Sequence, residues 1–338
     1  MFRNLIRLNK ANISETSRYN KIRIKASGNN IEFYDLLNNI LWKNIPIAHI
    51  EKYKYLKNHI NPFPLKAKVL ASANAWKTDE KLKIMAAILA ERDCKIITAQ
   101  HGGNTGISSH SPMESHLIDI SDRYLFFGSG ASYPDNKNKI KKINFPNLVL
   151  PQKKVQKSQN NILYLTNDVP KFFIHYRYGP IKNNTLIYKK DQFSLIKKLI
   201  ANSNEKIIIR APGQNYFDKL IESHINVEFD NMQRRFEEVV SCSKIVIVDN
   251  INTTFTQCLL LNKPTILFVN SLVWDFDDDF LEIAKILEDA GILFYDIDKA
   301  VARFINLSND QTLWFKCPFS SKNQHAPHLI NSVDLGIG

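Results

Sequence analysis

Short apolar segments alternate with longer amphipathic segments through most of this chain, from residue 67 to residue 295. The apolar segments, such as KIITA at 95–99 and IVIV at 245–248, are rich in β-branched residues, which is typical of buried strands. The segments between them repeat apolar residues every three or four positions, as helices packed on one side do. Strand–helix–strand succession requires parallel strands with right-handed crossovers. The pattern therefore predicts an α/β protein built on open parallel sheets.

The boundaries of these elements follow from the same pattern. The first 65 residues are expected to be helical and irregular, with one helix over 31–42. Asp79 or Thr78 can cap the helix that follows the first strand. Strands are predicted at 67–73, 95–99, 123–127, 162–165, 206–210, 245–248, 265–269 and 292–295, and helices at 78–92, 192–201, 232–241, 254–261 and 280–290.

A polar and basic stretch, PQKKVQKSQNN at residues 151–161, interrupts this alternation. It contains few large apolar side chains, so it is the best candidate for a linker. A chain of 338 residues is long enough for two domains. We therefore expect two α/β domains, residues 1–156 and residues 157–338. Because ligands of open parallel sheets bind beyond the carboxyl ends of the strands, the two domains would enclose a cleft.

The net charge of +12 is concentrated in the first part of the chain. Residues 1–200 hold 33 Lys and Arg against 14 Asp and Glu, and residues 201–338 hold 12 against 19. A basic surface attracts nucleic acid, acidic lipid head groups or a phosphorylated acceptor. The lysine-rich composition of an AT-rich genome would explain the same bias. Nucleic acid is not expected as a partner, because the chain has no RNP-type aromatic pattern, zinc finger or clear helix-turn-helix.

Membrane and redox signals are few. No apolar run reaches the roughly 18 residues that cross a bilayer, and no signal-peptide apolar region follows the basic N-terminus. We expect a cytoplasmic protein, with peripheral contact to the inner face of an anionic membrane. The four cysteines are far apart and form no CxxC pair, so we expect buried free thiols. The acidic run at 275–279 lacks the spacing of a calcium loop and is expected to be a solvated helix start.

The most distinctive local feature is the glycine-rich segment QHGGNTG at residues 100–106. Gly102 and Gly103 would let the backbone approach a ligand, such as a donor phosphate, closely. His101 has an ordinary pKa near neutrality, which suits a general base. Glu114 could orient His101 or bind an acceptor hydroxyl. The alternative is a glycine-rich turn with an incidental histidine.

A second candidate site is the polar turn VDNINTT at residues 248–254. Thr253 and Thr254 stand at the expected start of a helix, where free N–H groups and the positive end of the helix dipole suit a pyrophosphate. Gln257 would point from the first turn of that helix towards the same pocket. Simple helix capping by Thr253 explains the same residues without a ligand, and one geometry could serve both purposes.

Two arginines could hold a phosphate. Arg210 ends an expected strand, and a charge at the carboxyl end of a strand is positioned for an anion in a cleft. Arg177 lies in the segment HYRYGP at residues 175–180 and is a second candidate. A surface ion pair explains either arginine equally well.

Taken in order, these segments resemble a family of transferases encoded in bacterial surface-polysaccharide gene clusters. The family is distantly related to the CDP-glycerol glycerophosphotransferases and the GT-B glycosyltransferases. The resemblance covers roughly residues 66–316 and rests on Lys68–Ala75, Gln100–Gly106 through Glu114, Ser121–Tyr124, Tyr176–Tyr178, Ile209–Arg210, Thr253–Leu259, Lys263–Thr265, Gly291–Ile292 and Trp314.

The resemblance implies a GT-B fold, that is, two Rossmann-like domains facing a cleft. Acceptor chemistry would belong to an abbreviated N-terminal domain, and the C-terminal domain would hold the nucleotide. His101 would correspond to a base or a phosphate contact. Arg210, Thr253 and Thr254 would correspond to donor-binding positions. Gln257 stands where relatives usually place a glutamate.

The resulting hypothesis is a transferase that moves a glycosyl or polyol-phosphate group from a nucleotide-activated donor to a surface-glycan acceptor, either a glycan or a lipid-linked molecule. His101 would deprotonate the acceptor hydroxyl, and Arg210 with Arg177 would stabilise the leaving phosphate. No cofactor is expected, and protein groups can hold the phosphate without a metal. The alternative is a non-catalytic nucleotide- or glycan-binding accessory protein on a degenerate GT-B scaffold, which Gln257 and the short N-terminal part favour.

Overall fold

A computed structural model of the chain describes residues 31–60, 66–102, 106–108, 112–126, 138–143, 160–167, 184–212 and 217–315. The chain divides into two compact units. The first contains residues 1–68 and 78–94, and the second contains residues 69–77 and 95–338. The domain boundary predicted at residues 156 and 157 falls outside the described residues and stays a prediction.

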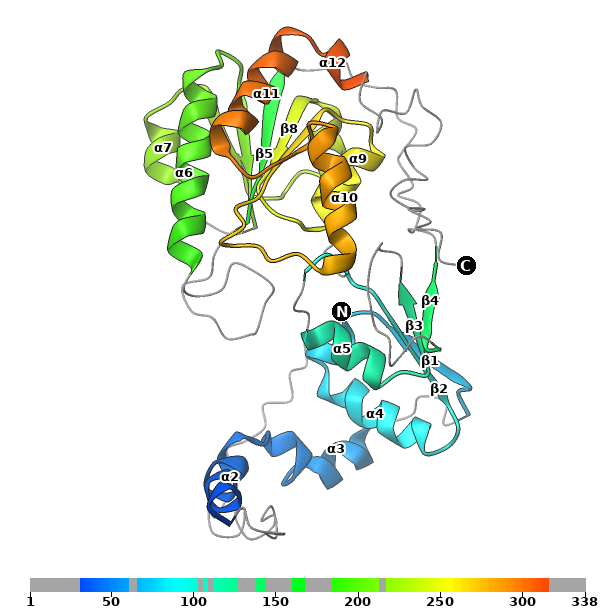
Figure 1. Cartoon of the computed structure of the whole chain (residues 1–338). Coiled ribbons are helices and arrows are strands. Elements are labelled where there is room, and N and C mark those ends of the chain that lie inside the picture. The colour runs from blue at the N-terminus through cyan, green and yellow to red at the C-terminus, as the bar shows by residue number, and fades with distance from the viewer. Residues whose placement is uncertain are drawn as a thin grey trace. The chain divides into compact units, whose positions relative to one another are not determined.

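The first unit is helical (Figure 1). In α4, Asp79 occupies the N-cap, and its carboxylate accepts hydrogen bonds from the backbone N–H groups of Lys81 and Leu82, both at 3.0 Å. Of the two predicted caps, Thr78 and Asp79, the structure confirms Asp79, which bonds two N–H groups that have no acceptor within the helix. The helices of this unit are α2 (Ile31–Asn44), the 3₁₀ helix η1 (Ile47–His49), α3 (Tyr53–His59) and α4 (Glu80–Ala90).

The second unit contains a four-stranded sheet in which the strands follow one another in chain order and are all parallel. Asp122 stabilises the amino ends of two strands, because its carboxylate accepts a hydrogen bond from the N–H of Ile96 at 2.8 Å. The carboxyl ends of all four strands lie at the opposite edge. The elements are β1 (Val69–Ser72), η2 (Ala75–Lys77), β2 (Lys95–Ala99), α5 (Pro112–Asp119), β3 (Arg123–Phe126) and β4 (Ile140–Lys142).

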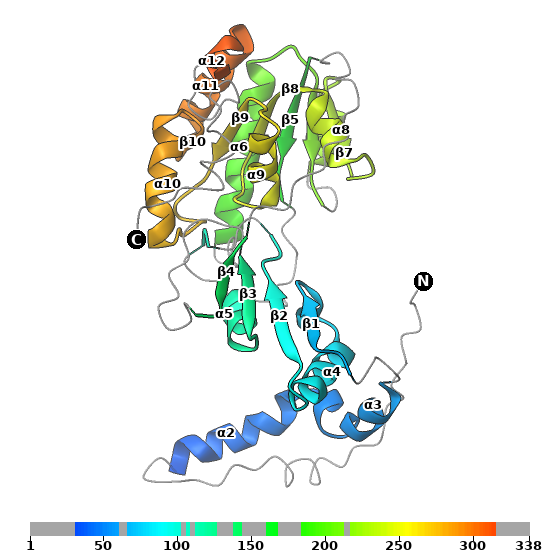
Figure 2. The same cartoon turned by 90° about the vertical axis from the view of Figure 1, so that its right-hand side faces the viewer.

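The second unit also contains a six-stranded parallel sheet (Figures 1 and 2). Its strands are β5 (Asn161–Leu165), β6 (Ile207–Arg210), β7 (Val227–Asp230), β8 (Ser243–Val248), β9 (Thr265–Phe268) and β10 (Leu293–Phe294). The order across the sheet is β10-β9-β8-β5-β6-β7. The chain therefore winds outward from β5 to β7, returns to β8 beside β5, and winds outward in the other direction. This is the strand order of the Rossmann fold, and its point of reversal lies between β5 and β8.

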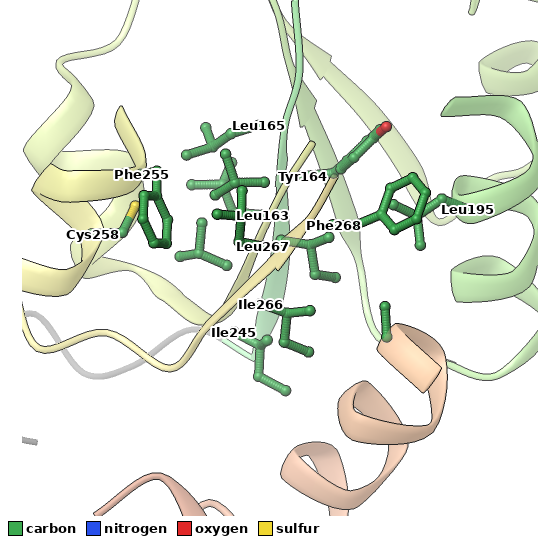
Figure 3. Close-up of a cluster of buried hydrophobic side chains, with 14 of the residues drawn as sticks. Leu163, Tyr164, Leu165, Leu195, Ile245, Phe255, Cys258, Ile266, Leu267 and Phe268 are labelled. Carbon is green, nitrogen blue, oxygen red and sulfur yellow. The ribbon is translucent and has the colours of Figure 1, made fainter. Parts of the chain in front are cut away.

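Helices cover both faces of the six-stranded sheet. Leu163 and Leu165 of β5 point towards Phe255 of α9, whereas Tyr164 points to the opposite face, near Leu195 of α6 (Figure 3). Parallel strands buried on both faces need apolar residues at successive positions, which explains the apolar strand segments in the sequence. The helices are α6 (Thr185–Ala201), α7 (Asp218–Glu222), α8 (Phe236–Ser241), α9 (Thr253–Leu260), α10 (Asp278–Asp289), α11 (Ile297–Asn309) and α12 (Thr312–Phe315).

The eight predicted strands are confirmed within a few residues, but two helices begin elsewhere. α6 starts at Thr185 instead of residue 192. α8 starts at Phe236 instead of residue 232, because Met232 has a φ of 66° and its N–H bonds to the side chain of Asp230. Such a left-handed conformation cannot continue into a helix. The prediction missed β4, β7, α5, α7, α11 and α12 as separate elements.

Membrane-spanning helices, metal clusters and cysteine pairing can be assessed for the described residues. Among these residues, no helix is long and apolar enough to cross a membrane. Acidic, histidine and cysteine side chains form no group of three or more that could hold a metal ion within the same ranges. Cys94, Cys242 and Cys258 are free thiols, and two of them are buried. Trp314 is fully buried.

Candidate functional site at the carboxyl edge of the six-stranded sheet

The reversal of the strand order places two polar segments side by side. Leu165 at the end of β5 pairs with Val248 at the end of β8. Thr166–Asn167 and Asp249–Asn250 follow these residues, so both segments lie at the carboxyl edge of the sheet. In open parallel sheets the crevice at this point is where ligands bind. The edge between β5 and β8 is therefore the candidate site.

Asp249 is the centre of a buried hydrogen-bond network at this edge. Its side chain accepts hydrogen bonds from the hydroxyls of Tyr164 at 2.6 Å, Thr166 at 2.5 Å and Tyr188 at 2.8 Å. The amide of Asn250 donates a fourth at 3.2 Å. Asp249 is only 2% exposed, and this burial raises the pKa of its carboxyl group, while the four hydrogen bonds oppose the rise.

The turn after this network leads into α9. Asn252, not Thr253, occupies the N-cap position, so the expectation that Thr253 caps the helix is wrong. Thr253 and Thr254 are the first two helical residues and are half-buried, as is Gln257 one turn later. The N–H groups at the start of a helix have no intrahelical acceptor and lie at the positive end of the dipole. The turn therefore places Thr253, Thr254 and the first backbone N–H groups of α9 at the strand-reversal edge.

Arg210 ends β6, as predicted, but it is buried and paired. Its guanidinium contacts the carboxylate of Asp230, at the end of β7, at 2.6 Å. It also donates to the carbonyl oxygen of Arg234 at 3.0 Å. The ion-pair alternative therefore describes Arg210, although the pair lies in the interior and not on the surface. Binding of a donor phosphate by Arg210 stays a prediction, and Arg177 lies outside the described residues.

His101 and Glu114 belong to the four-stranded sheet. His101 is the second residue after β2 and is exposed, and the carbonyl of Gly102 beside it accepts a hydrogen bond from the side chain of Gln100 at 2.6 Å. Glu114 lies in the first turn of α5 and is buried. Its carboxylate accepts hydrogen bonds from the Tyr124 hydroxyl at 3.3 Å and from the N–H of Gly106 at 3.4 Å.

These contacts give Glu114 a structural role at the end of the glycine-rich segment. Its predicted effect on His101 or on an acceptor stays a prediction. Gly103 lies outside the described residues. Downstream of the segment, the carbonyl of Ile107 accepts a hydrogen bond from the N–H of Asp277 at 2.8 Å, and Ser108 pairs with Phe276. The residues after the glycine-rich segment are thus bonded to the chain that precedes α10.

The Asp249 network was not predicted as a unit from the sequence. Asp249 stood inside the polar turn, but its partners Tyr164 and Tyr188 read as ordinary core residues of a strand and a helix. The available signal was an acidic residue directly after four branched strand residues, a position that buries the carboxylate unless the chain turns outward at once.

The strand order defines an α/β protein of the Rossmann class, with a polar edge at the strand reversal that is a candidate ligand site. A sequence profile, that of the LIC12162 family transferases, matches residues 3–316. The chain therefore belongs to this family and is a transferase, which confirms the predicted enzyme class. A comparison with curated proteins gives no match.

Several solved structures resemble the chain at low sequence identity. Anabaena Alr3699/HepE in complex with UDP-glucose is 12% identical, with 92% of this chain and 87% of that one covered and a TM-score of 0.48. The wall teichoic acid polymerase TagF is 12% identical, with 82% and 79% covered and a TM-score of 0.40. TarM is 13% identical, with 79% and 52% covered and a TM-score of 0.43, so the match spans about half of TarM.

Proposed function

We propose that this transferase moves a glycosyl or polyol-phosphate group from a nucleotide-activated donor to a surface-glycan acceptor. The observation that carries the proposal is the reversal of strand order between β5 and β8, followed directly by the hydroxyl-rich start of α9. Membership of a transferase family supplies the reaction class.

The donor would bind at the carboxyl edge of the six-stranded sheet. The N–H groups and hydroxyls of Thr253 and Thr254 suit a pyrophosphate, and an anion at such a helix start gains about 0.3–1 kcal/mol from the dipole. Gln257, half-buried on the same helix, can donate and accept hydrogen bonds with a ribose hydroxyl. Arg210, at the end of the neighbouring strand β6, would be a further donor contact, although Asp230 balances its charge.

The acceptor would be activated by His101. This histidine is exposed and is the second residue after β2. A neutral imidazole can take the proton of an attacking hydroxyl, which contributes about 10²- to 10⁴-fold to a rate. Gly102 and Gly103 would let the backbone approach the donor phosphate. Glu114, bonded to Gly106, would keep this segment in place.

Donor binding is tested with a panel of CDP-, UDP- and GDP-linked donors in thermal-shift and calorimetric titrations. A donor that binds wild type should bind more weakly to Thr253→Ala and Thr254→Ala. Thr256→Ala is the matched control for Thr254→Ala, because residues two apart on a helix point to different sides. Unchanged affinity in both threonine variants would refute this donor site. We expect binding to persist in EDTA, because the proposed contacts involve protein groups alone.

Transfer is tested separately from binding. His101→Ala should bind the donor normally and lose about 10²- to 10⁴-fold in transfer, as measured by release of the nucleotide. Wild-type binding without any turnover, across the donors and with glycan or lipid-linked acceptors, would instead support the alternative of a non-catalytic accessory protein.

The proposal includes peripheral contact with an anionic membrane, where a lipid-linked acceptor would lie. Phe33, Leu36 and Ile40 share one face of α2 and are 61%, 63% and 46% exposed. Residues 1–60 hold 11 Lys and Arg against 4 Asp and Glu. An exposed apolar helix face in a basic segment is typical of helices that lie on anionic bilayers.

Vesicle co-sedimentation tests the membrane contact. Wild type should bind vesicles of phosphatidylcholine with phosphatidylglycerol and not vesicles of phosphatidylcholine alone. Leu36→Asn should weaken this binding, and Asp35→Glu, an exposed change of unaltered charge on the other side of α2, should not. Equal binding of the two variants would refute a role for this helix face.

A further inference from the structure

The carboxylate of Asp249 has all its hydrogen bonds inside the protein. One oxygen accepts from Tyr164 and Thr166, and the other accepts from Tyr188 and Asn250. The carboxylate and its four partners are all buried. The two oxygens therefore have little capacity left for a ligand, so Asp249 is not a candidate to touch substrate.

The partners of Asp249 belong to three separate segments of the candidate site. Thr166 begins the segment after β5, Tyr188 lies in the first half of α6, and Asn250 lies in the turn between β8 and α9. Tyr188 and Asn250 also make hydrogen bonds to the backbone of neighbouring segments. The hydroxyl of Tyr188 accepts a hydrogen bond from the N–H of Asn167 at 3.4 Å. The side-chain oxygen of Asn250 accepts one from the N–H of Asn252, the N-cap of α9, at 3.3 Å.

A further residue of α6 closes the network. The side-chain amide of Gln192 donates to the hydroxyl of Thr166 and to the carbonyl of Asn167, the latter at 3.1 Å. Hydrogen bonds to the side chain of Thr166, and to the N–H and the carbonyl of Asn167, thus hold the segment after β5.

We propose that Asp249 is a positioning residue for donor binding, which holds the segment after β5, the first half of α6 and the start of α9 in one arrangement. The proposal rests on the proposed function, because it assumes that the donor binds at this edge. Asp249 would set where the N–H groups and hydroxyls of Thr253 and Thr254 stand, and would do so without contacting the donor.

The chemistry of the network distinguishes this role from simple core packing. The donors that face Asp249 are three hydroxyls and one amide, all neutral. A buried carboxylate without a cation is costly, and apolar residues of similar volume stabilise a core better. The network also lies at the strand reversal and not at the amino end of the sheet. A polar network that is fully bonded specifies one arrangement of the segments that it joins, which is what a binding site requires.

The test compares variants at both ends of the same strand. Asp249→Asn keeps the size of the side chain but replaces one acceptor oxygen by a donor, so the hydroxyls that face it must reorient. Tyr188→Phe removes one hydroxyl that joins α6 to the segment after β5. Ser243→Ala is the matched control, because it removes a buried hydrogen bond of 2.7 Å to Val239 at the amino end of β8. All are titrated with the donor that wild type binds best, well below their unfolding temperatures.

We expect Asp249→Asn and Tyr188→Phe to raise the donor Kd and the donor KM at least about 10-fold, with the KM for acceptor unchanged. Ser243→Ala should keep the wild-type values even where it lowers Tm as much. Wild-type donor affinity in Asp249→Asn, or in Tyr188→Phe where Asp249→Asn does not fold, would overturn the inference. If wild type binds no donor, the proposed function fails before the variants are compared.

Discussion

For the buried ion pair of Arg210 and Asp230, we predict that loss of the aspartate destabilises the fold more than loss of the arginine. Removal of one partner from a buried ion pair leaves an uncompensated charge and costs about 3–5 kcal/mol. After Arg210→Ala, Asp230 keeps the N–H of Met232 at 3.1 Å and the guanidinium of Arg234 at 3.4 Å. After Asp230→Ala, the described contacts leave Arg210 only the Arg234 carbonyl at 3.0 Å. Asp230→Ala should therefore cost about 5 kcal/mol and Arg210→Ala about 3 kcal/mol.

A double variant separates the charge from the packing. In Arg210→Met/Asp230→Leu both charges are gone and apolar volume fills the space, so stability should return to within about 1–2 kcal/mol of wild type. Free energies of unfolding are measured by urea titration with far-UV circular dichroism, with Lys285→Met at an exposed pair as the control. A cost below about 1 kcal/mol for Asp230→Ala, or a larger cost for Arg210→Ala, would refute the buried-pair reasoning. Because Arg210→Ala is destabilised in any case, its donor affinity is informative only where it remains folded.

Three further predictions concern stability. Asp79→Ala should lose about 1 kcal/mol in urea unfolding by removing the cap of α4, and Asp79→Ser should recover most of it. Trp314→Ala should lose about 3–5 kcal/mol in the same assay, because the side chain is fully buried and bonded to Asn262 at 3.1 Å; a loss near zero would contradict its place in the core. Burial raises the pKa of Asp249, so the folded state holds this proton more tightly than the unfolded chain does. Wild-type stability should therefore fall as pH rises above about 4, more steeply than that of Asp249→Asn, and parallel curves between pH 4 and 7 would contradict the assignment.

Local patterns in the sequence were enough to predict the class of fold and most strand positions. Segments such as IVIV at 245–248 are apolar at successive positions, and only a strand covered on both faces accommodates them. The cap at Asp79 was also predictable, because a cap acts on N–H groups two and three residues away. The start of α8 was not, because it depends on a side-chain bond between Asp230 and the backbone of Met232.

The sequence by itself thus determined that the chain forms parallel α/β sheets, and that polar residues follow several of the strands, because these properties depend on neighbours within a few residues. Only the tertiary structure decided which of those polar residues meet. Arg210 pairs with Asp230 because β6 and β7 are adjacent, and Tyr164 reaches Asp249, 85 residues away in the chain, because β5 lies beside β8. The order of strands across a sheet depends on the packing of the whole domain, so no local pattern carries that information.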